Sequence, residues 1–216
     1  MSGVLLLSLV VGAYFLGAIP FGWIVARARG VDILRVGSGN IGATNVARMV
    51  GLGWGVLVFL LDFAKGAVPV RLAGLLDPSA DVEMPPHSVE VIAGIAAFLG
   101  HLFPIYLGFR GGKGVATGAG VAVALVPIIT LIALATWGLT LALTRYVSIA
   151  SILAAALVFV LRVAFTPGPW GYEEVVITIF CLFGSTLVAL RHATNIRRLL
   201  AGSEPRMGSP DPEVDP

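Results

Sequence analysis

Long apolar runs limit what this chain can fold into more than any other feature of its sequence. A helix needs about 20 apolar residues to cross the ~30 Å hydrocarbon core of a bilayer. Only 12% of the residues are charged, whereas soluble domains carry roughly 25%. We therefore expect an all-α integral membrane protein and not a soluble enzyme with a large core. Clear candidate spans lie at 3–25, 52–76, 89–107, 147–165 and 173–190.

The apolar run at 115–144 is harder to interpret. About 30 helical residues would extend roughly 45 Å, so the run is either one overlong helix or two short ones that turn near Pro127. The charges decide between these readings. Two polar segments hold acidic residues without Lys or Arg, 77–90 and 166–174, whereas basic residues cluster in 27–48, 110–113 and 191–206. Basic segments face the cytoplasm, so the run must cross twice. We predict seven transmembrane helices, with the N-terminus outside and the C-terminus cytoplasmic.

The chain is expected to form one membrane domain, residues 1–201, followed by a polar, Pro-rich tail at 202–216 that we expect to be disordered. The first apolar run has its cations after it, which indicates a retained span and not a cleaved secretion signal. Cys181 lies within an apolar run and favours no disulfide framework. Spacings typical of metal ligands are absent from the sequence, so we expect no metal and no other cofactor.

Three polar segments fall on the predicted cytoplasmic side, and the first is 37–48. Its glycines permit close approach of a ligand to backbone amides, and its Ser, Asn and Thr residues add neutral hydrogen-bonding groups. Arg48 supplies a forked cation that suits phosphate. We favour an anion-binding loop over a plain connector. The candidate residues are Ser38, Gly39, Asn40, Gly42, Thr44, Asn45 and Arg48.

The second segment, 108–120, reads GFRGGKGVATGAG. It lacks the spacing and the Ser/Thr of a nucleotide-binding P-loop. Glycine N–H groups, the charge of Lys113 and a helix that begins near Val115 predict an anion site instead. The alternative is a basic turn that only anchors the topology. The candidate residues are Gly111, Gly112, Lys113, Gly114 and Thr117, with His101 as either a ligand contact or a packed histidine.

The third segment is 191–198, where His192 and Asn195 share one helical face, with Arg191 and Arg198 nearby. The alternative is a terminal basic cluster that contacts lipid headgroups. Two weaker signals remain. Arg145 and Ser148, in the turn TRYVSIAS at 144–151, could close a site. Asp62 and Lys65 lie at i, i+3 within the second span, either as a neutralising pair or as a substrate contact.

Together the three segments resemble one family. "SGNIGATNVAR", "GHLFPIYLGFRGGKGVATG" and "RHATNIRRLLAGSEP" are similar to the three cytoplasmic motifs of the bacterial acyl-phosphate-dependent glycerol-3-phosphate acyltransferases, the PlsY family. "LLDFAKGAVPV" and "LTRYVSIASILAA" follow in the expected order between them, and the resemblance covers residues 3–206. It implies a multi-pass inner-membrane enzyme with a cytoplasmic active site. Such an enzyme moves an acyl chain from acyl phosphate to the sn-1 hydroxyl of glycerol 3-phosphate, giving lysophosphatidic acid and inorganic phosphate in phospholipid synthesis.

The same resemblance implies catalytic roles for five residues, Ser38, Arg48, Lys113, His192 and Asn195, while the other candidates bind substrate or phosphate. The hydroxyl proton would go to His192 or to the leaving phosphate, and we favour the phosphate because no carboxylate partner for His192 is apparent nearby. The alternative function is an anion transporter, although no internal repeat is found and the polar motifs lie at one membrane face. We expect a monomer in the bilayer and no nucleic-acid partner.

Overall fold

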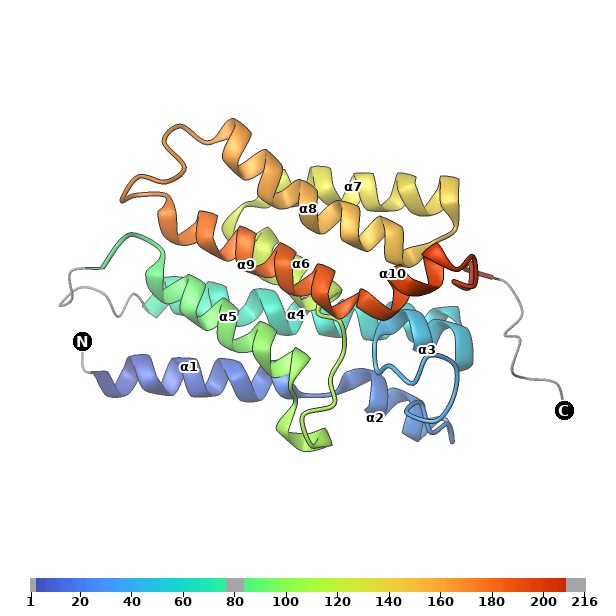
Figure 1. The fold of residues 1–216 in the computed structure, drawn as a ribbon. Helices are drawn as coiled ribbons and strands as arrows, with labels where there is room; N and C mark the ends of the chain where they lie inside the picture. The colour runs from blue at the N-terminus through green and yellow to red at the C-terminus, as the bar shows by residue number, and fades with distance from the viewer. Residues whose placement is uncertain (1–2, 77–83, 209–216) are drawn as a thin grey trace, which may run out of the picture.

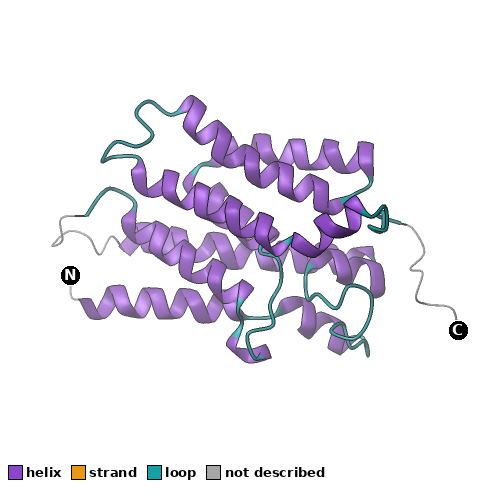
Figure 2. Cartoon of the chain, in the orientation of Figure 1, coloured by secondary structure: helices purple, strands orange, loops and turns teal. Residues whose placement is uncertain are grey.

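The computed structural model describes residues 3–76 and 84–208, and its regular structure within these residues is entirely helical (Figures 1 and 2). Part of the acidic segment at 77–90 and the tail at 209–216 lie outside the described residues. The helices are α1 (Gly3–Ala18), α2 (Phe21–Ala28), α3 (Ala43–Met49), α4 (Leu52–Leu76), α5 (Ser88–Leu102), the 3-10 helix η2 (Ile105–Leu107), α6 (Val115–Leu125), α7 (Pro127–Thr144), α8 (Val147–Phe165), α9 (Val175–Arg191) and α10 (Ala193–Leu200).

The expected first span at 3–25 is interrupted. Helix α1 ends at Ala18 and α2 begins at Phe21, with Pro20 between them. Proline has no N–H to donate and its ring crowds the preceding turn, which breaks a helix. The Lys65 ammonium, on α4, donates a hydrogen bond of 2.7 Å to the Ile19 carbonyl oxygen at this break. A carbonyl that lost its helical partner thus gains one from another helix.

The long run at 115–144 forms two helices, which is the alternative that the charge pattern of the sequence favoured. Helix α6 ends at Leu125, Val126 leaves the helical region with φ −135° and ψ 68°, and Pro127 is the first residue of α7. Proline suits the first position of a helix because the N–H there has no helical partner. The turn near Pro127 is therefore confirmed.

The outer surface of the helices is apolar, as a bilayer requires. By length and composition, four helical stretches among the described residues could cross a membrane, and a fifth could if the bent pair of α9 and α10 counts as one span. Helix α6 is apolar but has 11 residues. Many large side chains point away from the protein, each more than half exposed: Leu7, Leu60, Ile128, Leu139, Leu143, Val160 and Phe165.

The arrangement of the helices gathers the polar segments at one end of the molecule. Figure 1 shows α1, α4, α5, α6, α7, α8 and α9 running in alternating directions. Helix α4 packs between α5 and α6, α1 lies against α5, and α8 contacts both α7 and α9. The loop before α3, the loop before α6, the turn between α7 and α8, and α10 consequently lie toward the same end (Figure 1).

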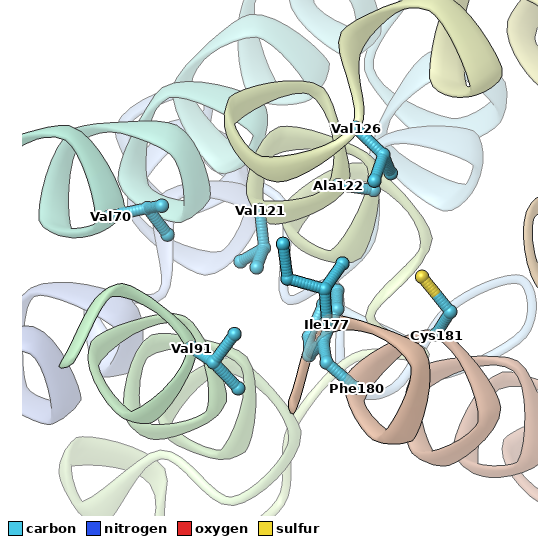
Figure 3. Close-up of a cluster of buried hydrophobic side chains, with 8 residues drawn as sticks. All are labelled: Val70, Val91, Val121, Ala122, Val126, Ile177, Phe180 and Cys181. Carbon is cyan, nitrogen blue, oxygen red and sulfur yellow. The ribbon is translucent and has the colours of Figure 1, made fainter. Parts of the chain in front are cut away.

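The interior is packed closely from several helices. Figure 3 shows one buried cluster to which α4, α5, α6 and α9 each contribute side chains, among them Val70, Val91, Val121 and Phe180. A Cβ atom on Gly66 would lie 2.2 Å from the Thr117 carbonyl oxygen. Helices α4 and α6 therefore approach backbone to backbone, which small residues permit in membrane proteins.

Candidate functional site

A polar cavity of ≈ 120 Å³ lies among α3, α4, the end of α5, the start of α6, the α7–α8 turn and α10. This space can hold several water molecules, since one needs about 10–15 Å³ by such a measure. Twelve of the residues expected at the site line it: Ser38, Asn40, Gly42, Thr44, Asn45, Arg48, His101, Gly114, Lys113, Ser148, His192 and Asn195. The three polar segments do converge. The expected residues that do not line the cavity are Gly39, Gly111, Gly112, Thr117 and Arg145.

Asn45 organises the first loop from within. Its Oδ1 accepts a hydrogen bond of 3.1 Å from the Ser38 N–H. Its Nδ2 lies 3.0–3.3 Å from the carbonyl oxygens of Ile33, Val36 and Asn40, and the side chain is buried. The expectation that Asn45 binds phosphate therefore changes, because its amide groups are already bonded to the loop backbone.

Gly39 also shapes this loop. It has φ +65°, in the left-handed region where a side chain is strained, and its N–H donates to the Val36 carbonyl at 3.1 Å. Gly39 thus closes a turn next to Ser38 and Asn40 without itself lining the cavity. Gly39 therefore maintains the shape of the loop and is not expected to contact a ligand.

Arg191 fixes the glycine loop before α6. Its guanidinium donates to the Gly112 carbonyl from Nε at 3.1 Å and from Nη2 at 2.8 Å, and to the Gly111 carbonyl from Nη2 at 3.0 Å. The Gly112 N–H donates in turn to the His101 carbonyl at 3.2 Å. Because a trans peptide directs its N–H and C=O oppositely, the Lys113 N–H points away from Arg191. Sequence reasoning placed Arg191 near the site but gave it no role.

Gly111 and Gly112, within this loop, pack against the end of α5. A Cβ atom on Gly111 would lie 2.2 Å from the His101 carbonyl oxygen, and one on Gly112 would lie 2.2 Å from His101 Nε2. Any larger residue would push the loop out of place. These glycines therefore permit the loop conformation and do not line the cavity.

Helix α6 begins at Val115, as expected, with Gly114 as its N-cap at φ +83°. The start of this helix directs its free N–H groups and the positive end of its dipole toward the Lys113 side of the cavity. Thr117 differs from the expectation. Its side chain is fully buried, and its Oγ1 has no hydrogen-bond partner among the described residues. Thr117 lies in the helix-packing interior and not at the cavity wall.

A chain of hydrogen bonds links the second and third segments. Lys113 Nζ donates to Asn195 Oδ1 at 2.6 Å, and Asn195 Nδ2 donates to Glu204 Oε1 at 2.7 Å. Glu204 also accepts from Ser148 Oγ and from Arg198 Nε, each at 2.8 Å. One carboxylate thus ties the α7–α8 turn to α10.

The electrostatics of this chain follow from its burial. Burial lowers the pKa of Lys113 to about 8, the Glu204 carboxylate opposes this shift, and the Arg198, Arg48 and Arg191 cations add to it. Burial alone would raise the pKa of Glu204, but the hydrogen bonds from Asn195, Arg198 and Ser148 outweigh it and lower that pKa. Glu204 is therefore ionised at neutral pH, and Lys113 is mostly protonated.

Sequence reasoning missed Glu204, which it assigned to a disordered tail. In the structure the tail runs along the α7–α8 turn over residues 203–208. Arg145 Nε and Nη2 donate to the Met207 carbonyl at 3.1 and 2.8 Å, and the Met207 N–H donates to the Arg145 carbonyl at 2.7 Å. Arg145 therefore anchors this segment and does not face the cavity. A lone Glu directly after a basic cluster was the available signal, because such an anion pairs readily with nearby arginines.

His192 lies between α9 and α10, buried at the cavity wall. Its Nδ1 is 2.7 Å from the Val188 carbonyl oxygen, which can only accept a hydrogen bond. The proton therefore sits on Nδ1, and Nε2 is the acceptor nitrogen. His192 presents a neutral imidazole of fixed orientation.

An apolar cavity of ≈ 80 Å³ adjoins the polar one, and α4 to α9 all contribute to its walls. Phe59, Val115, Trp137 and Ser151 line both cavities. At this junction the Trp137 Nε1–H donates to Ser151 Oγ at 3.1 Å. Sequence analysis did not locate this cavity, because its small and apolar residues look like any other helix-packing positions.

Comparison with known proteins identifies the family. The sequence model of a family described as glycerol-3-phosphate acyltransferase matches residues 7–202. The chain belongs to the glycerol-3-phosphate acyltransferase family. It is therefore an acyltransferase of phospholipid synthesis and an integral membrane protein.

Two relatives support this family membership over nearly the full length of the chain. The glycerol-3-phosphate acyltransferase of Aquifex aeolicus is 44% identical over 93% of this chain and 98% of its own length. That of Jannaschia sp. is 46% identical over 91% of this chain and 90% of its own.

Two solved structures share the fold. A crystal structure of PlsY (YgiH), an integral membrane glycerol 3-phosphate acyltransferase, in its glycerol 3-phosphate form, is 42% identical, with a TM-score of 0.83 over 94% of this chain and 96% of that one. The lysophosphatidic acid form has a TM-score of 0.79, the same identity, and coverage of 94% and 95%.

Proposed function

We propose that this acyltransferase takes its acyl chain from acyl phosphate and transfers it to the sn-1 hydroxyl of glycerol 3-phosphate. The observation that carries the proposal is the junction of two unlike cavities. Arg48, Lys113 and Arg198 line a polar cavity that shares Phe59, Val115, Trp137 and Ser151 with an apolar one. Acyl phosphate has the same two parts, an anionic phosphate and an apolar chain joined at the reacting carbonyl.

Both substrates carry a phosphate, so the protein must hold two anions that repel each other. Arg48, Lys113 and Arg198 supply the compensating charge. Ser38, Asn40 and Thr44 supply neutral hydrogen-bonding groups beside Arg48. The Lys113 N–H and the start of α6 add fixed backbone donors that can stabilise charge on the carbonyl oxygen in the transition state. The acyl chain would extend into the apolar cavity past Trp137.

The proton and electron changes balance without a protein base. The acceptor hydroxyl oxygen forms a bond to the acyl carbon, and the bond from that carbon to the phosphate oxygen breaks. The hydroxyl proton goes to the leaving phosphate, which departs as inorganic phosphate. His192 commits its Nδ1–H to a backbone carbonyl and not to a carboxylate. Its Nε2 is left to orient a substrate oxygen together with Asn195.

The membrane arrangement is part of the proposal. Helices α1, α4, α5, α6, α7, α8 and α9 would be the seven spans of one membrane domain, with the N-terminus outside and the C-terminus cytoplasmic. The apolar outer faces of these helices and the basic residues at the end where the cavity lies support this orientation. The active site of a monomer in the inner membrane would then face the cytoplasm, where glycerol 3-phosphate is found.

A donor comparison tests the proposed function. The purified protein, in detergent or proteoliposomes, is given glycerol 3-phosphate with acyl phosphate, acyl-CoA or acyl carrier protein. We expect lysophosphatidic acid and stoichiometric phosphate with acyl phosphate, and no product with either thioester. Activity with a thioester alone would overturn the donor assignment. Product carrying the chain at the 2-position would overturn the proposed regiochemistry.

A further inference from the structure

The segment between α5 and the glycine loop, residues 103–110, carries apolar side chains on its outer surface. Figure 1 shows the green segment that follows α5 projecting from the side of the bundle. Ile105, Tyr106 and Phe109 are 45%, 55% and 58% exposed. The function proposed above gives this segment no role. A group of outward apolar side chains on a short loop marks a surface that contacts a partner or lipid.

The backbone of this segment is suited to a surrounding with little water. The N–H groups of residues 107–110 all donate to carbonyl oxygens within residues 104–107, at 2.9–3.3 Å. The Phe103 carbonyl accepts a hydrogen bond of 2.8 Å from Tyr14 Oη on α1. Backbone groups that enter a bilayer must find their partners within the protein, because lipid tails offer none. This segment meets that requirement over its exposed part.

The outer surface of the segment is continuous with a lipid-facing helix. The ring centroids of Tyr106 and of Phe15, in the last turn of α1, lie 6.3 Å apart. Helix α1 belongs to an apolar stretch long enough to cross a membrane, and Phe15 is partly exposed on it. Aromatic rings concentrate where lipid meets water. The exposed Arg110, next to Phe109, adds a cation suited to lipid phosphates. The bilayer is therefore the partner that this surface fits.

The segment is connected rigidly to the polar cavity. Leu107 packs into the buried cluster formed by residues of α2, α3 and α4 and the loop between α2 and α3. The Arg191 guanidinium lies 5.7 Å from the centroid of the Phe103 ring, and the same group holds the Gly111 and Gly112 carbonyls. A displacement of the segment would consequently move the glycine loop and the Lys113 that ends it.

We propose that Ile105, Tyr106 and Phe109 insert into the headgroup boundary of the surrounding bilayer and thereby hold the glycine loop at a fixed height against it. The substrates and products of this acyltransferase differ in polarity, so the reaction takes place across this boundary. A fixed height aligns Lys113 with groups that approach from water and from lipid. The anchor depends neither on the acyl donor nor on the regiochemistry proposed above.

Fluorescence quenching tests the insertion. Phe109→Cys and Ser203→Cys, each in Cys181→Ala protein, are labelled with bimane and reconstituted in vesicles of phosphatidylethanolamine and phosphatidylglycerol. Ser203 is exposed on the segment after α10. Lipid with a nitroxide near its ester carbonyls should quench the label at 109 and spare the label at 203, whereas aqueous iodide should do the reverse. Tyr106→Cys provides a second probe if Phe109→Cys does not fold.

Two results of this experiment would overturn the insertion. Equal quenching by iodide at positions 109 and 203 would place the segment in water. Dipolar coupling between nitroxide labels at position 109 of two copies would assign the surface to a dimer interface instead of lipid.

Activity tests the positioning, with whichever acyl donor the comparison above finds active. Phe109 has φ +65°, a conformation that asparagine tolerates, so Phe109→Asn removes the ring without adding backbone strain. Its kcat/KM in proteoliposomes should fall about fivefold or more, because small displacements of catalytic groups are costly. Phe109→Trp, which keeps an interfacial ring, should stay within about twofold of the wild type. In detergent, whose micelle adapts its boundary to the protein, Phe109→Asn should also stay within about twofold.

Leu200→Asn is the matched control, since Leu200 is 85% exposed on α10 and outside the segment. It should keep the wild-type kcat/KM in both media. The positioning role is overturned if folded Phe109→Asn loses no activity in proteoliposomes, if it loses as much in detergent, or if Leu200→Asn loses as much. Wild-type protein that is inactive with every donor would refute the proposed function, and the quenching experiment would still decide the insertion.

Discussion

Lys113 Nζ donates a hydrogen bond of 2.6 Å to Asn195 Oδ1, joining residues 82 positions apart in the sequence. Lys113 precedes α6, whereas Asn195 lies on α10. Asn195 donates in turn to Glu204, so an ammonium and a carboxylate share one amide between them. This connection holds the Lys113 charge at the cavity, where burial lowers the pKa of the ammonium to about 8.

The activity is expected to fall at alkaline pH through Lys113. Burial lowers the pKa of this ammonium to about 8, so its charge is present below that pH and is lost as the pH rises through it. We expect kcat/KM for glycerol 3-phosphate to fall by up to about tenfold per pH unit above pH ~8. Initial rates of phosphate release, corrected for spontaneous hydrolysis of acyl phosphate, provide the measurement.

Lys113→Arg provides the control, because a guanidinium stays charged over this pH range. Its kcat/KM at neutral pH should be lower than the wild-type value, yet the alkaline fall should be absent. An equally steep alkaline fall in Lys113→Arg would assign the titration to another group.

Arg191 is expected to act by positioning the glycine loop and not by its charge alone. Arg191→Lys keeps the charge but loses the fork that holds the Gly111 and Gly112 carbonyls. Because misplaced donors lose much of their effect on the transition state, we expect kcat/KM to fall about tenfold or more. Ethylguanidinium should partly restore the activity of Arg191→Ala.

The matched control is Arg197→Lys, at an exposed position on α10, which should behave like the wild type. Thermal midpoints in detergent show whether each variant is folded. If the kcat/KM of folded Arg191→Lys stays within about twofold of the wild-type value, Arg191 contributes only a positive charge that orients the protein in the membrane.

Glu204 is expected to stabilise the end of the protein at which the polar cavity lies. Glu204→Gln retains the shape of the side chain but leaves Arg198 without its counter-charge and weakens the bonds from Ser148 and Asn195. Losing a charged hydrogen-bond partner costs about 1–3 kcal/mol, so the thermal unfolding midpoint should fall. The exposed Glu173→Gln is the comparison. Equal midpoints for the two variants would rule out a stabilising role for Glu204.

The apolar cavity is expected to set the acyl-chain length that the enzyme accepts. Ala133 lines this cavity on α7, one turn or about 6 Å from Trp137 at the junction. Ala133→Leu would fill the space beyond the junction and lower kcat/KM for hexadecanoyl phosphate relative to decanoyl phosphate by about tenfold. Ala135→Leu, which faces outward, should leave this ratio unchanged. If active Ala133→Leu leaves this ratio unchanged, the acyl chain does not occupy this cavity.

Local chemistry was enough to predict most of the helices. Hydropathy and proline act over a few residues, so the runs around α4, α8 and α9 and the turn before Pro127 could be located without tertiary information. The break at Pro20 was missed. Pro20 was a local signal for it, but the apolar run was interpreted as one continuous span; only the tertiary structure shows that the Lys65 bond to Ile19, from a distant helix, stabilises the break.

The sequence by itself determined that phosphate-binding residue types occur in three segments, because composition and charge belong to each segment alone. Only the tertiary structure decided which of them face the cavity. Lys113 and His192 line it, Asn45 lines it with its amide bonded to backbone carbonyls, and Arg191 lies outside it and holds the glycine loop in place. Glu204 also lines the cavity, and only the tertiary structure shows this, because its partner Ser148 is distant in the sequence. Spacing along a chain fixes a residue's helical face, but which faces meet depends on how helices far apart in sequence pack together.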